Sequence, residues 1–169
     1  MSKKQQRLCV RMLILVMGVA GSGKTLIGSS LARSLGWRFV DADAFHPVAN
    51  VEKMTRGIPL TDADREPWLS AIQQAICNWT KSGDNVVLAC SALRRQYRER
   101  LSVGHDTKVV YLKGTFEVLY SRLSARRDHF MRPAMLTSQI ADLEEPENAI
   151  TIDILQSPEQ IVAEITGQL

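Results

Sequence analysis

A glycine-rich loop between an apolar run and a helical pattern constrains this fold most strongly. The run over residues 12–17 has strand length, and apolar residues over 26–35 recur at helical spacing. The eight residues between them that fit the phosphate-loop pattern G-x-x-x-x-G-K-[S/T] in full are Gly18, Val19, Ala20, Gly21, Ser22, Gly23, Lys24 and Thr25. Such a loop surrounds a phosphate with backbone N–H groups, and a Cβ would block that approach. We therefore expect bound ATP, with Lys24 reaching its β- and γ-phosphates and the Thr25 hydroxyl ligating Mg²⁺.

Length and charge favour one soluble domain over residues 12–169, preceded by a flexible tail over 1–11. The 169 residues are 45% hydrophobic and 23% charged, which is ordinary for a soluble protein. The net charge of +3 comes partly from the tail, whose short basic run has no interleaved aromatic residues. The apolar run after it is too short to span a membrane. We expect neither nucleic acid nor membrane as a partner.

The cysteines indicate a reducing, cytoplasmic setting. Cys9, Cys77 and Cys90 are odd in number and form no C-x-x-C pair. Cys77 and Cys90 lie in apolar runs, so we expect them to be buried thiols and neither disulfides nor zinc ligands.

Apolar runs of strand length alternate with helical patterns along the chain. The five predicted strands are 12–17, 38–41, 85–90, 108–112 and 149–154. Apolar stripes at three- and four-residue steps predict helices over 68–79, ended by Gly83, over 116–123 and over 161–165. We expect both tryptophans of the first stripe in the core. This alternation predicts an α/β fold with a doubly wound parallel sheet that binds its ligand at the carboxyl ends of the strands.

Other nucleotide-binding classes fit less well. The glycine spacing differs from the dinucleotide fingerprint G-x-G-x-x-G, and the D-x-x-G and N-K-x-D strings of GTPases do not occur. A motor-type ATPase usually ends its third strand in an acidic residue, whereas Cys90-Ser91 stands here. The remaining class is the small-molecule kinases, which close a flexible lid over the phosphates.

Two acids after the second strand are candidates for the acceptor site. A carboxylate of Asp41-Ala42-Asp43 can accept the proton of an attacking hydroxyl, although both acids can also be helix caps or solvated loop residues. His46 follows, before a helix start at Pro47, and can be merely a neighbour of the cap. Arg65 lies where a cation opposes the dipole of the following helix, which favours a role in binding a carboxylate.

Four arginines lie between residues 122 and 132. Arg122 and Arg126 share a helix face, and Arg127 and Arg132 follow before and within a break at 128–133. A solvated basic face explains the cluster equally well. A hinged lid over about 126–136 that brings cations to the transferring phosphate is the functional interpretation.

Five blocks of sequence, in order, make the chain from about residue 12 onward resemble the phosphate-loop gluconokinases. They are Gly18–Thr25; Asp41-Ala42-Asp43 with His46-Pro47; Gly57-Ile58-Pro59-Leu60 with Asp64-Arg65 and Pro67-Trp68-Leu69; Cys90-Ser91-Ala92-Leu93-Arg94-Arg95 with Tyr97-Arg98; and His129-Phe130-Met131. The phosphate loop is shared by many families, and the other four blocks together are specific.

The resemblance implies ATP- and Mg²⁺-dependent phosphorylation of D-gluconate at its 6-hydroxyl. It also implies a three-layer phosphate-loop kinase fold with five parallel strands and a mobile lid, a cytoplasmic setting and a homodimer. The residues to which it assigns roles are Lys24 and Thr25 for triphosphate and Mg²⁺, Asp43 as base, His46, Arg65 and Arg94 for the sugar acid, Arg122 near adenine, Arg126 or Arg127 as lid cation, and Ser91 through a water of the Mg²⁺ shell.

The chain departs from the family pattern at three positions: Asp128 stands where Gly is frequent, Ala44 where an acid is frequent, and Ala20 where Ser is frequent. Asp128 bears on lid flexibility and local charge.

Two alternatives stay open at the level of sequence. One is a kinase for another sugar acid or a nucleoside monophosphate, and the other is a non-catalytic nucleotide-binding module.

Overall fold

The computed structural model describes residues 12–104, 106–127 and 132–169, so the predicted tail lies outside it. The described chain forms one five-stranded sheet in the order β2-β3-β1-β4-β5, and every neighbouring pair is parallel. The strands are β1 (Met12–Met17), β2 (Arg38–Asp41), β3 (Val86–Ala89), β4 (Asp106–Lys113) and β5 (Ile150–Asp153). All five predicted strands are present, with ends that differ by no more than two residues.

Helices connect the strands. They are α1 (Lys24–Leu35), the 3₁₀ helix η1 (Ala42–Phe45), α2 (Val48–Thr55), α3 (Asp62–Ser82), α4 (Arg95–Leu101), α5 (Phe116–Ala125), α6 (Met135–Asp142) and α7 (Pro158–Gly167). Gly83 ends α3 in the left-handed conformation, as predicted. No helix in the described ranges is both long enough and apolar enough to cross a membrane.

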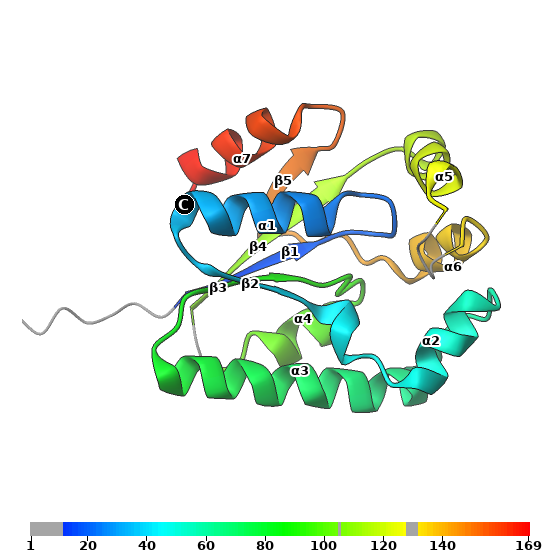
Figure 1. The fold of residues 1–169 in the computed structure, drawn as a ribbon, viewed down its shortest axis with the longest axis horizontal. Coiled ribbons are helices and arrows are strands. Elements are labelled where there is room, and N and C mark those ends of the chain that lie inside the picture. The colour runs from blue at the N-terminus through cyan, green and yellow to red at the C-terminus, as the bar shows by residue number, and fades with distance from the viewer. Residues whose placement is uncertain (1–11, 105, 128–131) are drawn as a thin grey trace, which may run out of the picture.

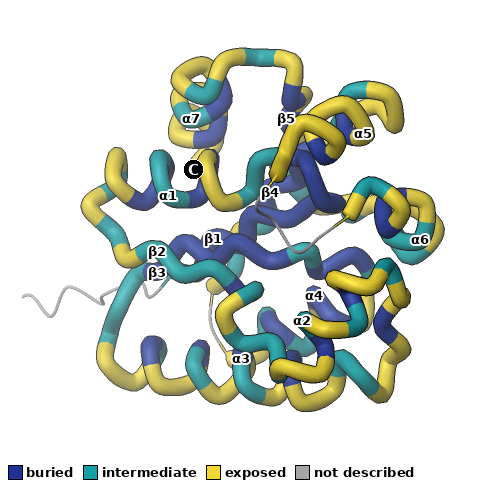
Figure 2. The backbone as a smooth tube through the Cα atoms, turned by 45° about the vertical axis from the view of Figure 1, so that its right-hand side comes forward, coloured by how far each residue is buried: buried dark blue, intermediate teal, exposed yellow. Residues whose placement is uncertain are grey.

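The central strand is buried on both faces, which explains its continuous apolar sequence. Ile14 and Val16 of β1 pack in one core with residues of α1, α5 and α7, while Leu13 and Leu15 pack in a second core with α3 and α4. Figure 1 shows α1 and α7 on one face of the sheet and α3 and α4 on the other. The central strands β1 and β3 are accordingly dark blue in the burial view of Figure 2, whereas the edge strand β2 is not buried. The fold is thus the predicted three-layer α/β architecture.

The strand order places β1 between two connections that run in opposite directions across the sheet. The chain passes from β1 to β2 and β3 on one side and then to β4 and β5 on the other. A crevice at the carboxyl ends of the strands is expected at such a reversal. The phosphate loop leaves β1 at this point, and η1 leaves β2 at the same edge.

Of the two cysteines predicted to be buried, one is exposed and one is buried. Cys77 is exposed, because it follows the buried Ile76 by one residue on α3 and therefore points away from the core stripe. In α5, Phe116 and Tyr120 are 44% and 46% exposed, and only Leu119 and Leu123 reach the core. Cys90 is buried as expected, and burial raises the pKa of its thiol to about 12.

Candidate active site

The phosphate loop has the backbone of an anion site. Gly23 stands at the N-cap of α1 in the left-handed conformation (φ 92°), and no side chain caps the helix. Gly21 also has positive φ, and a Cβ there would lie 2.9 Å from the carbonyl oxygen of Leu119. The first N–H groups of α1 consequently have no side-chain acceptor from an N-cap residue, and no acidic residue stands in the first turn. A triphosphate fits this cradle.

Lys24 lies inside the cavity with its charge only partly compensated. Its Nζ donates to the carbonyl oxygen of Val19 at 3.1 Å, within the same loop. Burial lowers the pKa of Lys24, and the nearby Asp43, Cys90 and Asp41 oppose that shift. Among the described residues, Ser22 Oγ is a buried side-chain oxygen for which no hydrogen-bond partner is found. Both observations fit a polyanionic ligand in this loop.

Asp41 and Asp43 have different environments. Asp41 Oδ2 accepts from the Thr25 hydroxyl at 2.6 Å, and Asp41 Oδ1 accepts from the Asp43 backbone N–H at 3.0 Å, which caps η1. The capping interpretation is therefore right for Asp41. Asp43 instead lines the main cavity together with Lys24 and Thr25. Asp41 belongs to the site through its contact with Thr25, which was not predicted from the sequence.

His46 and Trp68 form one wall of the cavity. Their rings stack with centroids 4.4 Å apart and planes 8° from parallel, and both residues line the cavity. Trp68 is 2% exposed and donates through Nε1 to the carbonyl oxygen of Ala42 at 2.8 Å, so it is both a core residue and a wall of the site. Burial, assisted by Arg65, lowers the pKa of His46 to about 4. His46 is therefore a neutral hydrogen-bonding group at pH 7.

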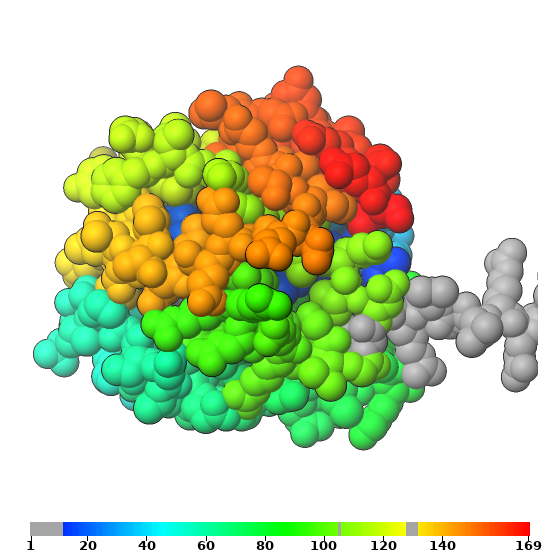
Figure 3. All heavy atoms as spheres, turned by 180° about the vertical axis from the view of Figure 1, so that it is seen from behind, coloured from blue at the N-terminus to red at the C-terminus, as the bar shows by residue number. Residues whose placement is uncertain are grey.

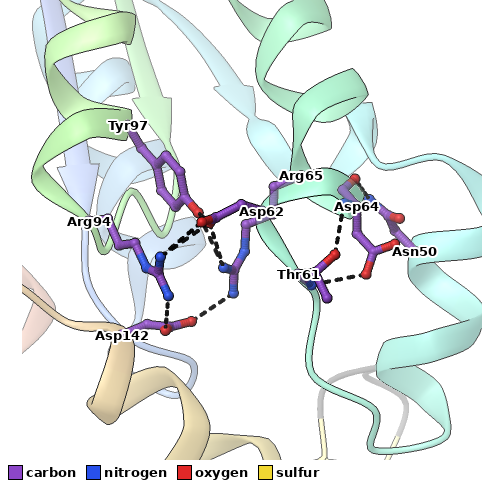
Figure 4. A network of polar contacts seen from close by, with 8 residues as sticks. All are labelled: Asn50, Thr61, Asp62, Asp64, Arg65, Arg94, Tyr97 and Asp142. Atoms are coloured by element: carbon purple, nitrogen blue, oxygen red, sulfur yellow. Dashed lines mark hydrogen bonds and ion pairs between the residues drawn. The ribbon is translucent and has the colours of Figure 1, made fainter.

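Arg65 projects from the first turns of α3 into a charge network (Figure 4). Its Nη2 donates to Asp142 Oδ2 at 2.8 Å, and its Nη1 donates to the Tyr97 hydroxyl at 3.3 Å. The Tyr97 hydroxyl in turn contacts Asp62. Arg65 and Asp142 both line the main cavity.

Arg94 is the second arginine of this network and lies further from the main cavity than Arg65. Its Nη2 donates to Asp142 Oδ1 at 2.8 Å, and its Nη1 donates to Asp62 at 3.1 Å. Arg94 lines a shallow surface hollow with Asp142 and does not line the main cavity. Arg65 thus lines the cavity in which the acceptor is predicted to bind, whereas Arg94 lies outside this cavity, on the other side of Asp142.

The remaining predicted residues divide in the same way. Ser91 and Arg126 line the main cavity, whereas Arg122 and Arg127 do not. Arg122 Nη2 donates to the carbonyl oxygen of Ile154 at 2.8 Å, beyond the end of β5. In the predicted lid, residues 128–131 lie outside the described residues, so the mobility of the lid stays a prediction.

The contribution of α6 to the cavity could not be predicted from the sequence. Met135, Ser138, Gln139 and Asp142 of this helix line the cavity. Gln139 Oε1 accepts from the backbone N–H of Ala20, inside the phosphate loop, at 2.7 Å. The only sequence signal for this helix was the break at Pro133, and nothing in its pattern indicates which residues face the cavity.

A phosphate loop at the centre of a five-stranded parallel sheet, facing a carboxylate and an arginine across one cavity, defines a phosphate-loop kinase. The family model of shikimate kinase matches residues 20–167. A probable gluconokinase of Xenopus tropicalis is 45% identical, covering 94% of this chain and 93% of that protein. A gluconokinase of Gluconobacter oxydans is 44% identical, with coverage of 90% and 88%.

A solved structure agrees with the sequence relatives. The gluconokinase of Sinorhizobium meliloti 1021 superimposes with a TM-score of 0.80 at 40% identity, covering 92% of this chain and 89% of that chain. The chain belongs to the gluconokinase family.

Proposed function

We propose that this protein transfers the γ-phosphoryl group of ATP to the 6-hydroxyl of D-gluconate. The observation that carries the proposal is a single cavity lined by Lys24 and Thr25 at one end and by Asp43, His46 and Arg65 at the other. The acceptor, gluconate, follows from the relatives, which are gluconokinases. A shared cavity brings donor and acceptor into contact, and that positioning is most of what phosphoryl transfer requires from a protein.

Asp43 is the proposed base. As the 6-hydroxyl oxygen forms its bond to the γ-phosphorus and the bond to the ADP oxygen breaks, the hydroxyl proton passes to the Asp43 carboxylate. Lys24 stabilises the negative charge that develops on the phosphate oxygens. The buried, partly compensated ammonium group is suited to this, because its charge interacts more strongly away from water.

Mg²⁺ has suitable oxygen ligands beside the loop. The Thr25 hydroxyl and the Asp41 carboxylate lie 2.6 Å apart, and Ser91 lines the same cavity. Hard oxygen donors with room for water suit this ion. When bound, Mg²⁺ neutralises phosphate charge. We assign Thr25 to it directly and Asp41 and Ser91 through water.

Gluconate has a carboxylate at one end and five hydroxyls. We assign its carboxylate to Arg65, because a guanidinium pairs with a carboxylate through two parallel hydrogen bonds. Neutral His46 can bond a hydroxyl, and Arg94 supports Arg65 through the shared Asp142. A site that pairs each hydroxyl rejects acceptors that lack one.

The remaining assignments rest on the family. We assign Arg122 to the adenine side and Arg126 and Arg127 to the lid cations; Arg126 lines the cavity. A cytoplasmic homodimer is also part of the proposal.

Two matched variants test the base and the reaction. We expect Asp43→Asn to lower kcat by about 10²–10⁴-fold with little change in ATP affinity, since the amide cannot accept the proton. Asp41→Asn instead should raise the Mg²⁺ concentration needed for half-maximal rate.

³¹P–¹H correlation spectra of the wild-type product should place phosphorus on carbon 6. Loss of kcat at saturating Mg²⁺ in Asp41→Asn but not in Asp43→Asn would reverse the two assignments, and phosphorus on another carbon would contradict the proposed reaction.

A further inference from the structure

Helix α6 contacts both halves of the cavity through groups that the ligands themselves need. Gln139 Oε1 lies 2.7 Å from the Ala20 backbone nitrogen in the phosphate loop. Three residues later, Asp142 Oδ2 lies 2.8 Å from Arg65 Nη2. Gln139 and Asp142 are separated by about one helical turn, so they face the same side of α6. One short helix therefore contacts both an N–H of the phosphate loop and an arginine that lines the same cavity.

The contact at Ala20 resembles a phosphate contact. A carboxamide oxygen on a phosphate-loop N–H stands in for a phosphate oxygen, because the loop directs its N–H groups at an anion. A single N–H donates to one acceptor at full strength. A triphosphate oxygen that takes this N–H must displace Gln139.

The contact at Arg65 resembles an acceptor contact. The Asp142 carboxylate occupies Arg65 Nη2, and Tyr97 and Asp62 occupy the side of Nη1. Two arginines and two aspartates then balance in this network, which leaves little net attraction for an incoming carboxylate. If gluconate takes Arg65, Arg94 keeps Asp62 as its partner at 3.1 Å, so the exchange leaves neither arginine without a carboxylate.

The chain beyond α6 provides an anchor about which the helix can move. The Glu144 backbone N–H donates to Leu93 O at 2.9 Å, and the buried Arg98 donates to Glu144 O at 2.8 Å and to the carbonyl oxygens of Ala92 and Leu93. Seen from behind in Figure 3, the segment after α6, in orange, lies next to the green part of the chain that includes α4.

We infer that α6 couples the two substrates, because Gln139 and Asp142 hold a phosphate-loop N–H and Arg65 until ATP and gluconate replace them. This inference rests on the proposed function for its acceptor half. Whichever ligand binds first bears the free-energy cost of releasing α6. The second ligand then binds more tightly than it would alone, and the factor is the same for either order of binding. Gln139 and Asp142 are positioning residues in this scheme, since each acts through a group that binds a substrate.

The test is a binding cycle by calorimetry with gluconate, Mg²⁺ and a non-hydrolysable ATP analogue. In the wild-type protein, the analogue should lower the Kd of gluconate by about five- to tenfold. Asp142→Asn should tighten gluconate binding in the absence of the analogue and bring this ratio close to one. Asp62→Asn is the matched control: it removes a carboxylate from the same network but from α3, and its ratio should stay at or above the wild-type value.

Gln139→Ala tests the other contact without any acceptor. It should lower the Kd of the ATP analogue by about three- to tenfold in the absence of gluconate, because the hydrogen bond that competes for the Ala20 N–H is removed. A wild-type ratio of one, weaker gluconate binding in Asp142→Asn with an unchanged ratio, or unchanged analogue affinity in Gln139→Ala would each overturn the inference. A wild-type protein that neither binds nor phosphorylates gluconate contradicts the proposed function instead, and the Gln139→Ala arm still decides the role of α6.

Discussion

Lys24 shows the cost of placing a functional charge in a protected cavity. Its ammonium group is buried, and burial lowers its pKa more than the neighbouring carboxylates raise it. Its Nζ donates a hydrogen bond to the carbonyl oxygen of Val19 in its own loop. The residue is therefore suited to a polyanion more than to stabilising the fold, as is common at active sites.

Lys24→Met separates these two effects. We expect kcat to fall on the order of 10²–10³-fold, because the charge that stabilises the transferring phosphoryl group is lost. The melting temperature should be unchanged or higher, since a buried charge is removed. Lys81→Met, at an exposed lysine near the end of α3, is the control and should alter neither. A folded Lys24→Met enzyme with wild-type kcat would exclude the phosphate-loop assignment.

His46 predicts a pH dependence of stability. Its pKa is about 4 in the folded protein and ordinarily 6.5, so between these values the unfolded chain binds the proton more strongly. Neutral His46 therefore contributes to the free energy of unfolding in full above pH 6.5, and this contribution is lost as the pH falls toward 4. His46→Asn should therefore show a shallower fall in melting temperature from pH 7 to pH 4.5 than the wild type. Because Asn also loses the stacking on Trp68, the slopes must be compared and not the absolute values; identical slopes would contradict the assigned pKa.

At the scale of elements, α3 presents the acceptor side from its first turn. Thr61 caps this helix through a reciprocal pair with Asp64, and Asp64 also binds Lys53 at 2.7 Å. These contacts hold the turn that carries Asp62 and Arg65. Helix α7 begins with the same kind of capping box, formed by Ser157 and Gln160, away from the acceptor site.

The two capping boxes form a matched pair for mutation. Thr61→Ala and Ser157→Ala should each lower the free energy of unfolding by about 1 kcal/mol, which corresponds to roughly 2–4 °C in melting temperature. Only Thr61→Ala should raise KM for gluconate, because only that cap aligns Arg65. Thermal unfolding and steady-state kinetics of both variants check this; an equal change of KM in the two would mean that the effect comes from stability alone.

Elements with strong local signals were predictable, and contacts between elements were not. The five strands and the loop followed from apolar continuity and glycine spacing. The exposure of Cys77 was predicted wrongly because its neighbours were read as one run and the helical rotation of 100° per residue was not applied. Asp41 on Thr25, Asp142 on Arg65 and Gln139 on Ala20 are tertiary contacts between residues far apart in sequence, and no local pattern encodes such pairs.

At the scale of the whole molecule, the strand order assembles the site. With β1 central, the phosphate loop, η1 and Ser91 after β3 meet at one edge of the sheet, and α6 lies across the cavity that they form. Donor and acceptor groups from across the chain thereby line one cavity. The proposed activity of this cavity is the phosphorylation of gluconate.

The most direct test is acceptor-stimulated ADP release by the wild-type protein with gluconate, idonate, shikimate and AMP. We predict the highest kcat/KM for gluconate, with shikimate and AMP lower by at least two orders of magnitude, because their shapes leave the cavity's polar groups unpaired. A higher kcat/KM for shikimate or AMP, or ATP binding with no acceptor-stimulated turnover, would contradict the claim.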